Sequence, residues 1–499
     1  MAVKRTVIIS PFSDLSSIGP RVLSGCLRQA GFPTRKLFLH VSQEKGGVSP
    51  GLFLYPESVL EKVGELCSDS LFVGVSLMTN YFDRVVQLSR FLRTQVGVPV
   101  VLGGIHATLM PKECAEFADY VCIGEGEGAI VDVARAFLEG KEPTQVANIA
   151  YIRDGEFIQN PLRALVQNLD DIPFPDYSLD DDYVLMDGDL HRMDKKDVKR
   201  LITSAAPGEK SAQERPYYMT MMTRGCRYAC TYCCNHRLFR LYGRRGFIRR
   251  RSVENLIKEL SWVRKNLPFV EFVVLTDDSF FDCDESQIHE FCQVYKERIG
   301  LPFFSLGTPF GVNDEKLRMM VDAGMIYVQV GIQTGSERIR KMYKRPFSNE
   351  EIISIADMLA KYVPRMLPPR YDIIIDNPME EDKDVIDSIR LLLKLKKPYF
   401  IQYFPLSLYP GTDLADRAAE SGIITNWKEQ VYRKKVFQKK RTYLNFVLNL
   451  FNTPVPKFIL RLLITRPALF LLNRPYFGRL LRLGLRSTSL VWVCLTAGR

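Results

Sequence analysis

Short apolar runs alternate with amphipathic stretches over the first 140 residues of the chain. The runs RTVIISP, PTRKLFL, LFVGVSL, VPVVLGG and DYVCIGEGE have the length and β-branched character of strands. Between them, residues 21–30, 59–66 and 82–93 repeat apolar positions at helical spacing. Strands that are apolar on both faces predict a doubly wound parallel sheet with helices on each side. Ligands of such sheets bind at the carboxyl ends of the strands.

The alternation weakens over residues 141–215 and then returns. NIAYIRDGEFIQN predicts a hairpin on an Asp-Gly turn, and the Pro-rich IPFPDY that follows predicts an extended linker. From residue 216 onward, six apolar runs separated by helical patterns predict a partial (β/α)6 TIM-type barrel, with its site at the carboxyl ends of the strands. We therefore expect four parts: a parallel-sheet domain (1–140), a hairpin and linker (141–215), a barrel (216–415) and an α-helical C-terminal region (416–499).

Three cysteines follow the first barrel strand at close spacing. Cys226, Cys230 and Cys233 form a CxxxCxxC loop within TRGCRYACTYCCNHR. Three thiolates on one loop can hold three corners of a cubane [4Fe-4S] cluster and leave one iron open. The alternative is a zinc site, which needs a fourth ligand. Cys234 is a poor candidate for the fourth zinc ligand, because neighbouring side chains point apart. His236 could serve as that ligand. The close spacing of three cysteines still favours an iron–sulfur cluster.

This loop, with Tyr232 just before the third cysteine, resembles that of the radical S-adenosylmethionine (SAM) superfamily. The resemblance implies that SAM chelates the open iron. It also implies that the reduced cluster, fed by an electron donor such as flavodoxin or ferredoxin, cleaves SAM to a 5′-deoxyadenosyl radical. The resemblance further places polar residues of the later strand ends near SAM: Asp277, Asp278, Ser305, Thr308, Gln333, Gly335 and Glu337. The fifth strand ends in IIDNPMEE and departs from the usual Gly-rich ending.

The N-terminal sheet carries GGIHATLMP and then GEGE, and it resembles the cobalamin-binding domain of cobalamin-dependent radical SAM enzymes. The resemblance makes these strand-end residues candidate cobalamin contacts: Ser76, Thr79, Asn80, Gly103, Gly104, His106, Thr108, Glu125 and Glu127. Free-standing cobalamin proteins use DxHxxG, whose His binds cobalt. Here DLSSIG keeps Asp14 and Gly19 but has Ser16 in place of that His, so we expect no cobalt ligand from this loop. A domain that binds a nucleotide, or nothing, is the alternative.

Basic charge is concentrated in the C-terminal region. No Asp or Glu follows Glu429, whereas fourteen Lys or Arg do, which exceeds the net charge of +11 of the whole chain. Residues 442–499 are rich in Leu, Phe and Ile, but basic residues and prolines interrupt every apolar run before it reaches membrane-spanning length. This pattern predicts a helix lying on a membrane surface. Packing on the barrel or on a dimer partner is an alternative, and nucleic-acid binding is not expected.

The N-terminus lacks a secretory h-region, and the eleven Cys fit a reducing compartment, so we expect a cytoplasmic protein held peripherally at the inner face of the membrane. The resemblance implies a cobalamin-dependent radical SAM methyltransferase acting on an unactivated carbon of a small, hydrophobic or lipid substrate. One alternative is a non-methylating oxidative cyclase or rearrangement enzyme, of the kind represented by the anaerobic Mg-protoporphyrin monomethyl ester cyclase. Another is a non-catalytic corrinoid protein. Tyr232, Gln333 and Tyr403 are candidate substrate contacts.

Overall fold

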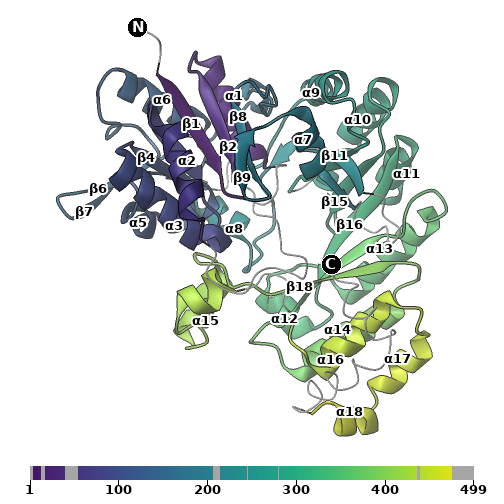
Figure 1. The fold of residues 1–499 in the computed structure, drawn as a ribbon. Helices are drawn as coiled ribbons and strands as arrows, with labels where there is room; N and C mark the ends of the chain where they lie inside the picture. The colour runs from purple at the N-terminus through teal and green to yellow at the C-terminus, as the bar shows by residue number, and fades with distance from the viewer. Residues whose placement is uncertain are drawn as a thin grey trace.

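The computed structural model describes residues 4–12, 17–39, 54–205, 214–243, 246–278, 280–434 and 439–474. Within these residues, two mainly parallel sheets each carry their own helices, and a helical C-terminal region contacts both (Figure 1).

The first sheet has nine strands in the order β7-β6-β5-β4-β3-β1-β2-β8-β9. Its strands are β1 (Arg5–Ser10), β2 (Thr34–Phe38), β3 (Ser70–Ser76), β4 (Val100–Gly103), β5 (Tyr120–Cys122), β6 (Ile149–Arg153), β7 (Glu156–Gln159), β8 (Asp182–Met186) and β9 (Asp189–Arg192). β1 to β5 and β8 are parallel, and the other three strands are antiparallel to their neighbours. The order changes direction between β1 and β3, the switch point at which sheets of this kind bind ligands.

Helices bury both faces of this sheet. The helices are α1 (Ile18–Gln29), α2 (Glu57–Cys67), α3 (Phe82–Phe91), α4 (Ile105–Leu109), α5 (Pro111–Ala115) and α6 (Glu127–Leu138). Successive residues of β1 point to opposite sides: Val7 and Ile9 pack with residues of α2 and α3, whereas Ile8 packs with residues of α1 and α6. The doubly wound sheet expected from the apolar runs is therefore confirmed.

The second sheet has the order β10-β11-β14-β15-β16-β17-β18. Its strands are β10 (Thr203–Ala205), β11 (Glu214–Thr220), β14 (Phe272–Leu275), β15 (Phe303–Gly307), β16 (Met325–Gln333), β17 (Arg370–Ile375) and β18 (Phe400–Pro405). The six strands from β11 to β18 are parallel, and β10 pairs antiparallel at the edge. The helices between them are α8 (Cys234–Tyr242), α9 (Val253–Asn266), α10 (Glu285–Arg298), α11 (Asp314–Asp322), α12 (Glu337–Met342), α13 (Asn349–Tyr362) and α14 (Asp382–Lys394). This is the predicted partial (β/α)6 barrel.

The segment expected as hairpin and linker is more ordered than its composition suggested. β6 and β7 form the hairpin, with positive φ at both Asp154 and Gly155 as its two-residue turn requires. β6 to β9 extend the first sheet to Arg192. Within IPFPDY, Asp176 accepts hydrogen bonds from Ser24 and from the buried Lys36, which ties the linker to the first domain. A short helix, α7 (Lys195–Leu201), then leads to β10.

The C-terminal region crosses between the two domains. α15 (Asp413–Glu420) and the π-helical turn η5 (Lys428–Tyr432) place Ala415, Ala418 and Tyr432 in the core of the first domain. α16 (Tyr443–Asn449), the turn η6 (Leu450–Asn452) and α17 (Lys457–Leu463) then pack on the barrel, followed by α18 (Arg466–Leu472). The packing alternative thus holds for the first part of this region. In the described chain, no helix has the length and apolarity needed to cross a membrane.

Candidate functional site

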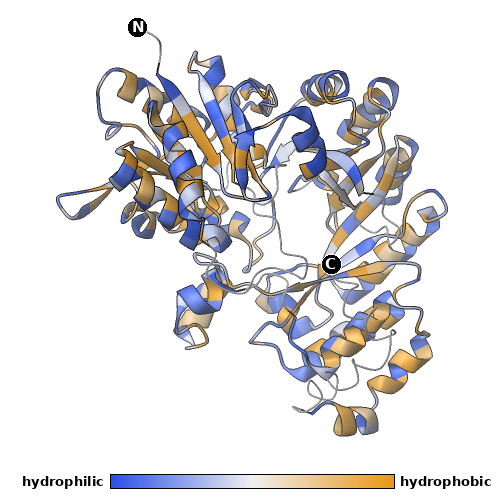
Figure 2. Ribbon diagram, in the orientation of Figure 1, coloured by the Kyte–Doolittle hydropathy of each residue, from blue (hydrophilic) through white to orange (hydrophobic). Residues whose placement is uncertain are grey.

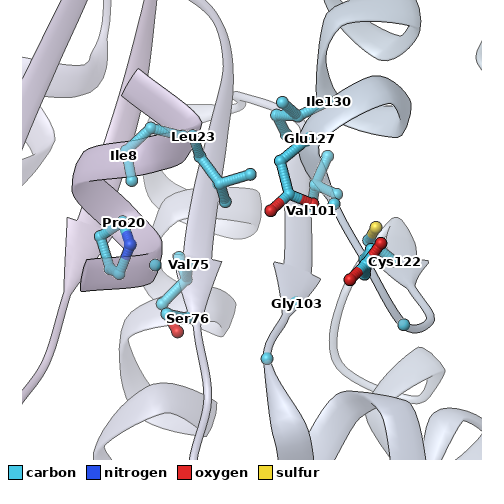
Figure 3. A pocket seen from close by; sticks show the side chains of 16 residues that line it. Ile8, Pro20, Leu23, Val75, Ser76, Val101, Gly103, Cys122, Glu127 and Ile130 are labelled. Atoms are coloured by element: carbon cyan, nitrogen blue, oxygen red, sulfur yellow. The ribbon is translucent and has the colours of Figure 1, made fainter. Parts of the chain in front are cut away.

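The first domain has a cavity of about 270 Å³ at its topological switch point. The cavity opens where β1, β3, β4 and β5 end and where α1 and α6 begin. Figure 3 shows Ile8, Leu23 and Val101 among the apolar side chains that line it, and Glu127 extending toward it from the start of α6. An apolar pocket with a few polar groups is the usual form of a small-molecule site. The domain therefore has a ligand cavity where its topology predicts one.

Six of the twelve residues predicted for this site line the cavity: Gly19, Ser76, Gly103, Gly104, Glu125 and Glu127. A Cβ added at Gly103 would meet nothing nearer than the Cβ of Cys122 at 3.8 Å, so its absence leaves room for a ligand. At Gly104, φ is 96° and a Cβ would lie 2.8 Å from the carbonyl oxygen of Leu77, so only glycine fits. Asp14 and Ser16 lie outside the described residues.

Four other candidates of this domain are absent from the cavity lining: Thr79, Asn80, His106 and Thr108. The buried imidazole of His106 pairs through Nδ1 with Thr79 Oγ1 at 3.0 Å and through Nε2 with Glu113 Oε2 at 3.4 Å. Thr108 Oγ1 donates to the carbonyl oxygen of Gly104 at 2.9 Å and accepts from the N–H of Gly124 at 2.9 Å, and Asn80 lies in the turn η1 (Thr79–Tyr81). The structure thus gives Thr79, His106 and Thr108 structural partners.

The three cysteines lie together in a second cavity of about 320 Å³, at the carboxyl ends of the barrel strands. Cys226, Cys230 and Cys233 line it together with residues from four strands, β14 to β17, or the loops after them, and with Arg345 of the α12–α13 loop. The other side chains and glycines are Tyr228, Tyr232, Asn235, Thr276, Asp277, Asp278, Phe280, Phe281, Asp282, Leu306, Gly307, Thr308, Gln329, Gly331, Gln333, Arg345 and Asp372. Carboxylates, amides and one guanidinium therefore surround three thiols on a single loop.

Asp277 and Asp278 hold the backbone of the cysteine loop. Asp277 Oδ1 accepts hydrogen bonds from the backbone N–H groups of Met222 at 2.8 Å and Thr223 at 2.5 Å. Asp278 accepts from the N–H of Gly225 at 3.2 Å. Burial raises the pKa of Asp277 to about 7 against these hydrogen bonds. Both carboxylates line the cavity, and both also fix the loop from which the cysteines project.

Charged contacts connect the two cavities. Glu125 Oε1 accepts from Arg249 Nη2 at 2.7 Å and from Arg224 Nη1 at 3.2 Å, and Glu127 Oε1 lies 2.7 Å from Arg224 Nη1. Glu125 is largely buried, yet the two guanidiniums hold its pKa below the ordinary value. Arg224 stands two residues before Cys226. The wall of the first cavity is thus bonded to the base of the cysteine loop.

Two family models match the chain at these two cavities. One, described as a B12 binding domain, matches residues 4–134, and one described as the radical SAM superfamily matches residues 220–392. The chain combines a B12-binding domain with a radical SAM domain. Its cofactors are accordingly a [4Fe-4S] cluster, SAM and cobalamin.

Related proteins match across both domains. The enzyme is 26% identical over 400 residues to an uncharacterised methyltransferase of Pyrococcus horikoshii, a match covering 79% of each chain. It is 26% identical over 308 residues to the anaerobic magnesium-protoporphyrin IX monomethyl ester cyclase of Rubrivivax gelatinosus, covering 57% of this chain and 47% of the cyclase. The structure of the cobalamin-dependent SAM radical enzyme OxsB with aqua-cobalamin bound aligns with a TM-score of 0.67 at 14% identity, covering 100% of this chain and 77% of OxsB. The last likeness supports the two-domain fold.

The residues of the radical SAM cavity fit a cluster. Each thiolate of a cubane binds a different iron, so the three sulfurs need to line one space and not to meet at one point. Among the described residues, no group of three His, Cys, Asp or Glu converges as a single-ion site would require. His236 pairs with Asp413 at 3.2 Å and does not line the cavity.

Cys234 follows Cys233 as the first residue of α8. It is absent from the lining of the cavity that the other three cysteines share. A role as cluster ligand is still predicted only for Cys226, Cys230 and Cys233.

Arg345 is the main cavity residue that sequence reasoning missed. Its Nη1 lies 3.5 Å from Cys230 Sγ, its Nη2 donates to the carbonyl oxygen of Gly331 at 2.7 Å, and its guanidinium lies 4.5 Å from the ring centre of Phe347. It is only 8% exposed. A buried cation beside a cysteine can pair with a thiolate or with the carboxylate of a ligand. The signal in the sequence was weak, a single Arg before a Pro-Phe pair.

The remaining candidates divide between the cavity and other surroundings. Tyr232, Thr308 and Gln333 line the cavity, whereas Ser305 is buried in β15 outside its lining. Glu337 faces solvent at the start of α12 and pairs with Lys341 at 2.7 Å. The hydroxyl of Tyr403 donates to the carbonyl oxygen of Leu448 in the C-terminal region, so this side chain is occupied in packing.

Proposed function

We propose that this enzyme is a cobalamin-dependent methyltransferase that acts on an unactivated carbon of a hydrophobic or membrane-associated substrate. The observation that carries the proposal is the link between its two cavities through one short segment, Gly124–Glu127. When bound, the cluster with SAM supplies a carbon-centred radical and cobalamin supplies a transferable methyl group, and both serve one substrate only where their sites adjoin. The relative from Pyrococcus horikoshii, which bears the name methyltransferase and matches both domains, supports the same reaction class.

The chain's own residues would orient the two cofactors and exclude water. The apolar side chains of the B12 cavity would cover one face of a large ligand, and Glu127 would accept a hydrogen bond from its polar edge. In the radical SAM cavity, Asp278 and Gln333 offer acceptors to an ammonium group, while Arg345 offers a donor to a carboxylate. These charges match the amino-acid end of SAM.

The test is anaerobic turnover of the reconstituted enzyme with methyl-labelled SAM, cobalamin, a low-potential reductant and a lipid extract from a strain that lacks the enzyme. Methylation is expected to release S-adenosylhomocysteine and 5′-deoxyadenosine together and to label one component of the extract. Release of 5′-deoxyadenosine without S-adenosylhomocysteine would rule out methylation. Cys230→Ala is the control and should release no 5′-deoxyadenosine.

A non-methylating cyclase is the second candidate, because the chain also resembles the cyclase of Rubrivivax gelatinosus over 308 residues. The same turnover separates the two functions. A cyclase would give 5′-deoxyadenosine and a product that has lost hydrogen, with no label from the methyl group of SAM.

The membrane contact was predicted for residues 431–499, of which 475–499 lie outside the described residues, and the contact that we propose is made by α17 and α18. Both helices are largely apolar (Figure 2), and Phe458, Leu462, Phe470 and Leu471 are 61%, 59%, 69% and 62% exposed. Basic residues flank them at Lys457, Arg461, Arg466 and Arg474, without any carboxylate after Glu429. Exposed aromatic and aliphatic side chains bordered by cations suit an anionic lipid surface.

Flotation with anionic liposomes tests this contact. Replacing the four exposed residues by Ser should abolish flotation, because about 0.8 kcal/mol of transfer free energy is lost for each buried CH₂ group. The control is Leu138→Ser with Ile152→Ser, which removes exposed apolar residues (51% and 39%) from the first domain. Equal flotation of the α17–α18 variant and the wild type would refute the membrane contact.

A further inference from the structure

The segment Gly124–Glu127 belongs to both cofactor sites. All four of its residues line the B12 cavity. On its other side, Glu125 and Glu127 pair with Arg224, Glu125 pairs with Arg249, and the backbone N–H of Glu125 donates to the hydroxyl of Tyr242 at 3.0 Å. Among the described residues, this segment supplies the ion pairs between the wall of the B12 cavity and the barrel.

These barrel partners come from both flanks of the cysteine loop. Arg224 and Arg249 face each other as register partners in the two-stranded ribbon of β12 (Thr223–Arg224) and β13 (Arg249–Arg250). Arg224 precedes Cys226 by two residues, and Tyr242 is the last residue of α8, the helix that begins directly after Cys233. A shift of the cysteine loop therefore moves the groups that hold the segment.

The contacts are close and specific. Gly124 has φ of +79°, and a Cβ built on it would lie 1.6 Å from the hydroxyl oxygen of Tyr242, so only glycine allows this approach. Arg249 is 6% exposed and its Nη1 also donates to the carbonyl oxygen of Val166 at 2.9 Å. Glu127 pairs with Arg224 through Oε1, whereas its Oε2 is buried without a hydrogen-bond partner among the described residues. That oxygen is available to a ligand in the cavity.

We propose that Arg224 and Tyr242 are positioning residues that couple cobalamin binding to loading of the iron–sulfur cluster. Neither residue lines the B12 cavity, so neither is expected to touch the corrinoid. A cluster anchors Cys226 and Cys233 and so restricts the motion of Arg224 and α8. The segment is then already ordered when cobalamin arrives, and less conformational entropy is lost on binding. Because coupling between two sites is reciprocal, cobalamin must favour the loaded cysteine loop by the same factor.

The coupling deepens the proposed function, but its test needs neither substrate nor turnover. The dissociation constant of hydroxocobalamin is measured anaerobically, by its absorbance change on binding, with full-length protein in cluster-loaded and cluster-free forms. For the wild type we expect cluster loading to tighten binding by about tenfold. In Arg224→Gln this ratio should fall to about one, and in Tyr242→Phe, which removes only the hydroxyl, it should fall partway.

Arg240→Gln is the matched control. Arg240 lies on α8 beside Tyr242 and pairs with both oxygens of Asp413, at 2.7 and 2.9 Å, away from the B12 cavity. In this variant, the ratio of the hydroxocobalamin dissociation constants of the cluster-free and cluster-loaded forms should equal that of the wild type. Far-UV circular dichroism and the iron content of each variant establish that it is folded and loaded.

Two results would overturn the coupling: a wild-type ratio near one, or a ratio in folded Arg224→Gln equal to that of the wild type. The reverse measurement gives a second reading, because cobalamin should alter the electron paramagnetic resonance spectrum of the reduced cluster in the wild type and not in Arg224→Gln. If methylation fails while the ratio behaves as expected, only the proposed reaction is lost.

Discussion

Gly335→Ala should destabilise the barrel through a clash with a backbone that has no room to move. A Cβ at this position would lie 2.6 Å from Cα of Ser388, 2.7 Å from the carbonyl oxygen of Asp387 and 2.9 Å from Cβ of Leu391, all on α14. Overpacking of this kind costs about 1–3 kcal/mol. The N–H of Gly335 also donates to Ser388 Oγ at 2.9 Å, and its loss costs about 1 kcal/mol. We expect the free energy of unfolding to fall by about 2–4 kcal/mol.

The assay is equilibrium unfolding in urea, combined with SAM binding by equilibrium dialysis. Gly335 lies between β16, which ends at Gln333, and α12, after which the chain reaches Arg345. A displacement of α12 should therefore also weaken SAM binding, by about tenfold for each 1.4 kcal/mol of binding free energy that is lost.

Gly422→Ala is the control for backbone strain, because Gly422 has φ of +73° and nothing within 4 Å of an added Cβ. It should cost about 1 kcal/mol and leave SAM binding unchanged. A stability of Gly335→Ala equal to the wild type would show that α14 yields, and the reasoning from close packing would be wrong.

Three further outcomes are expected. Cys230→Ala should lose the cluster, measured as iron and sulfide content, and retain cobalamin binding at the cluster-free affinity. Burial raises the pKa of Asp372 from 3.8 to about 7, against the hydrogen bonds from Gln329, so the folded chain holds this proton more tightly than the unfolded chain. The stability contributed by the protonated form is therefore lost as the pH rises from about 4 to 7. Asp372→Asn should flatten the dependence of the unfolding free energy on pH across that window. An unchanged slope of unfolding free energy against pH would contradict the assignment. Tyr432→Phe removes the hydrogen bond to Glu113 (2.8 Å) and should cost about 1 kcal/mol in urea unfolding, while no loss would show that ring packing alone holds η5.

The strands were predictable because burial on both faces leaves a local signature. In β1 the apolar run continues through Val7, Ile8 and Ile9, which face alternate layers of helices. The cysteine loop was predictable because its ligands are close in sequence. Both are features of a few consecutive residues.

Features set by distant segments were not predictable in this way. His106 stands two residues after Gly104 at the same strand end, and nothing local shows that Thr79 and Glu113 enclose its ring. Glu337 follows a cavity strand by only a few residues, but it begins a helix and faces solvent. Arg345 reaches Cys230 from 115 positions along the chain, a contact that only the folded barrel creates.

The crossing of the C-terminal region gives the two domains three covalent connections. The chain passes from the first domain to the barrel through the linker, returns to the first domain with α15 and Tyr432, and goes back to the barrel with Tyr443. Two bodies joined by three tethers can rock against each other but cannot drift apart, so we expect the motion that admits cobalamin or substrate to be hinge-like. Truncation before Tyr432 would remove the third connection together with the packing of Tyr432 on the first domain, while the linker and α15 would still join the domains.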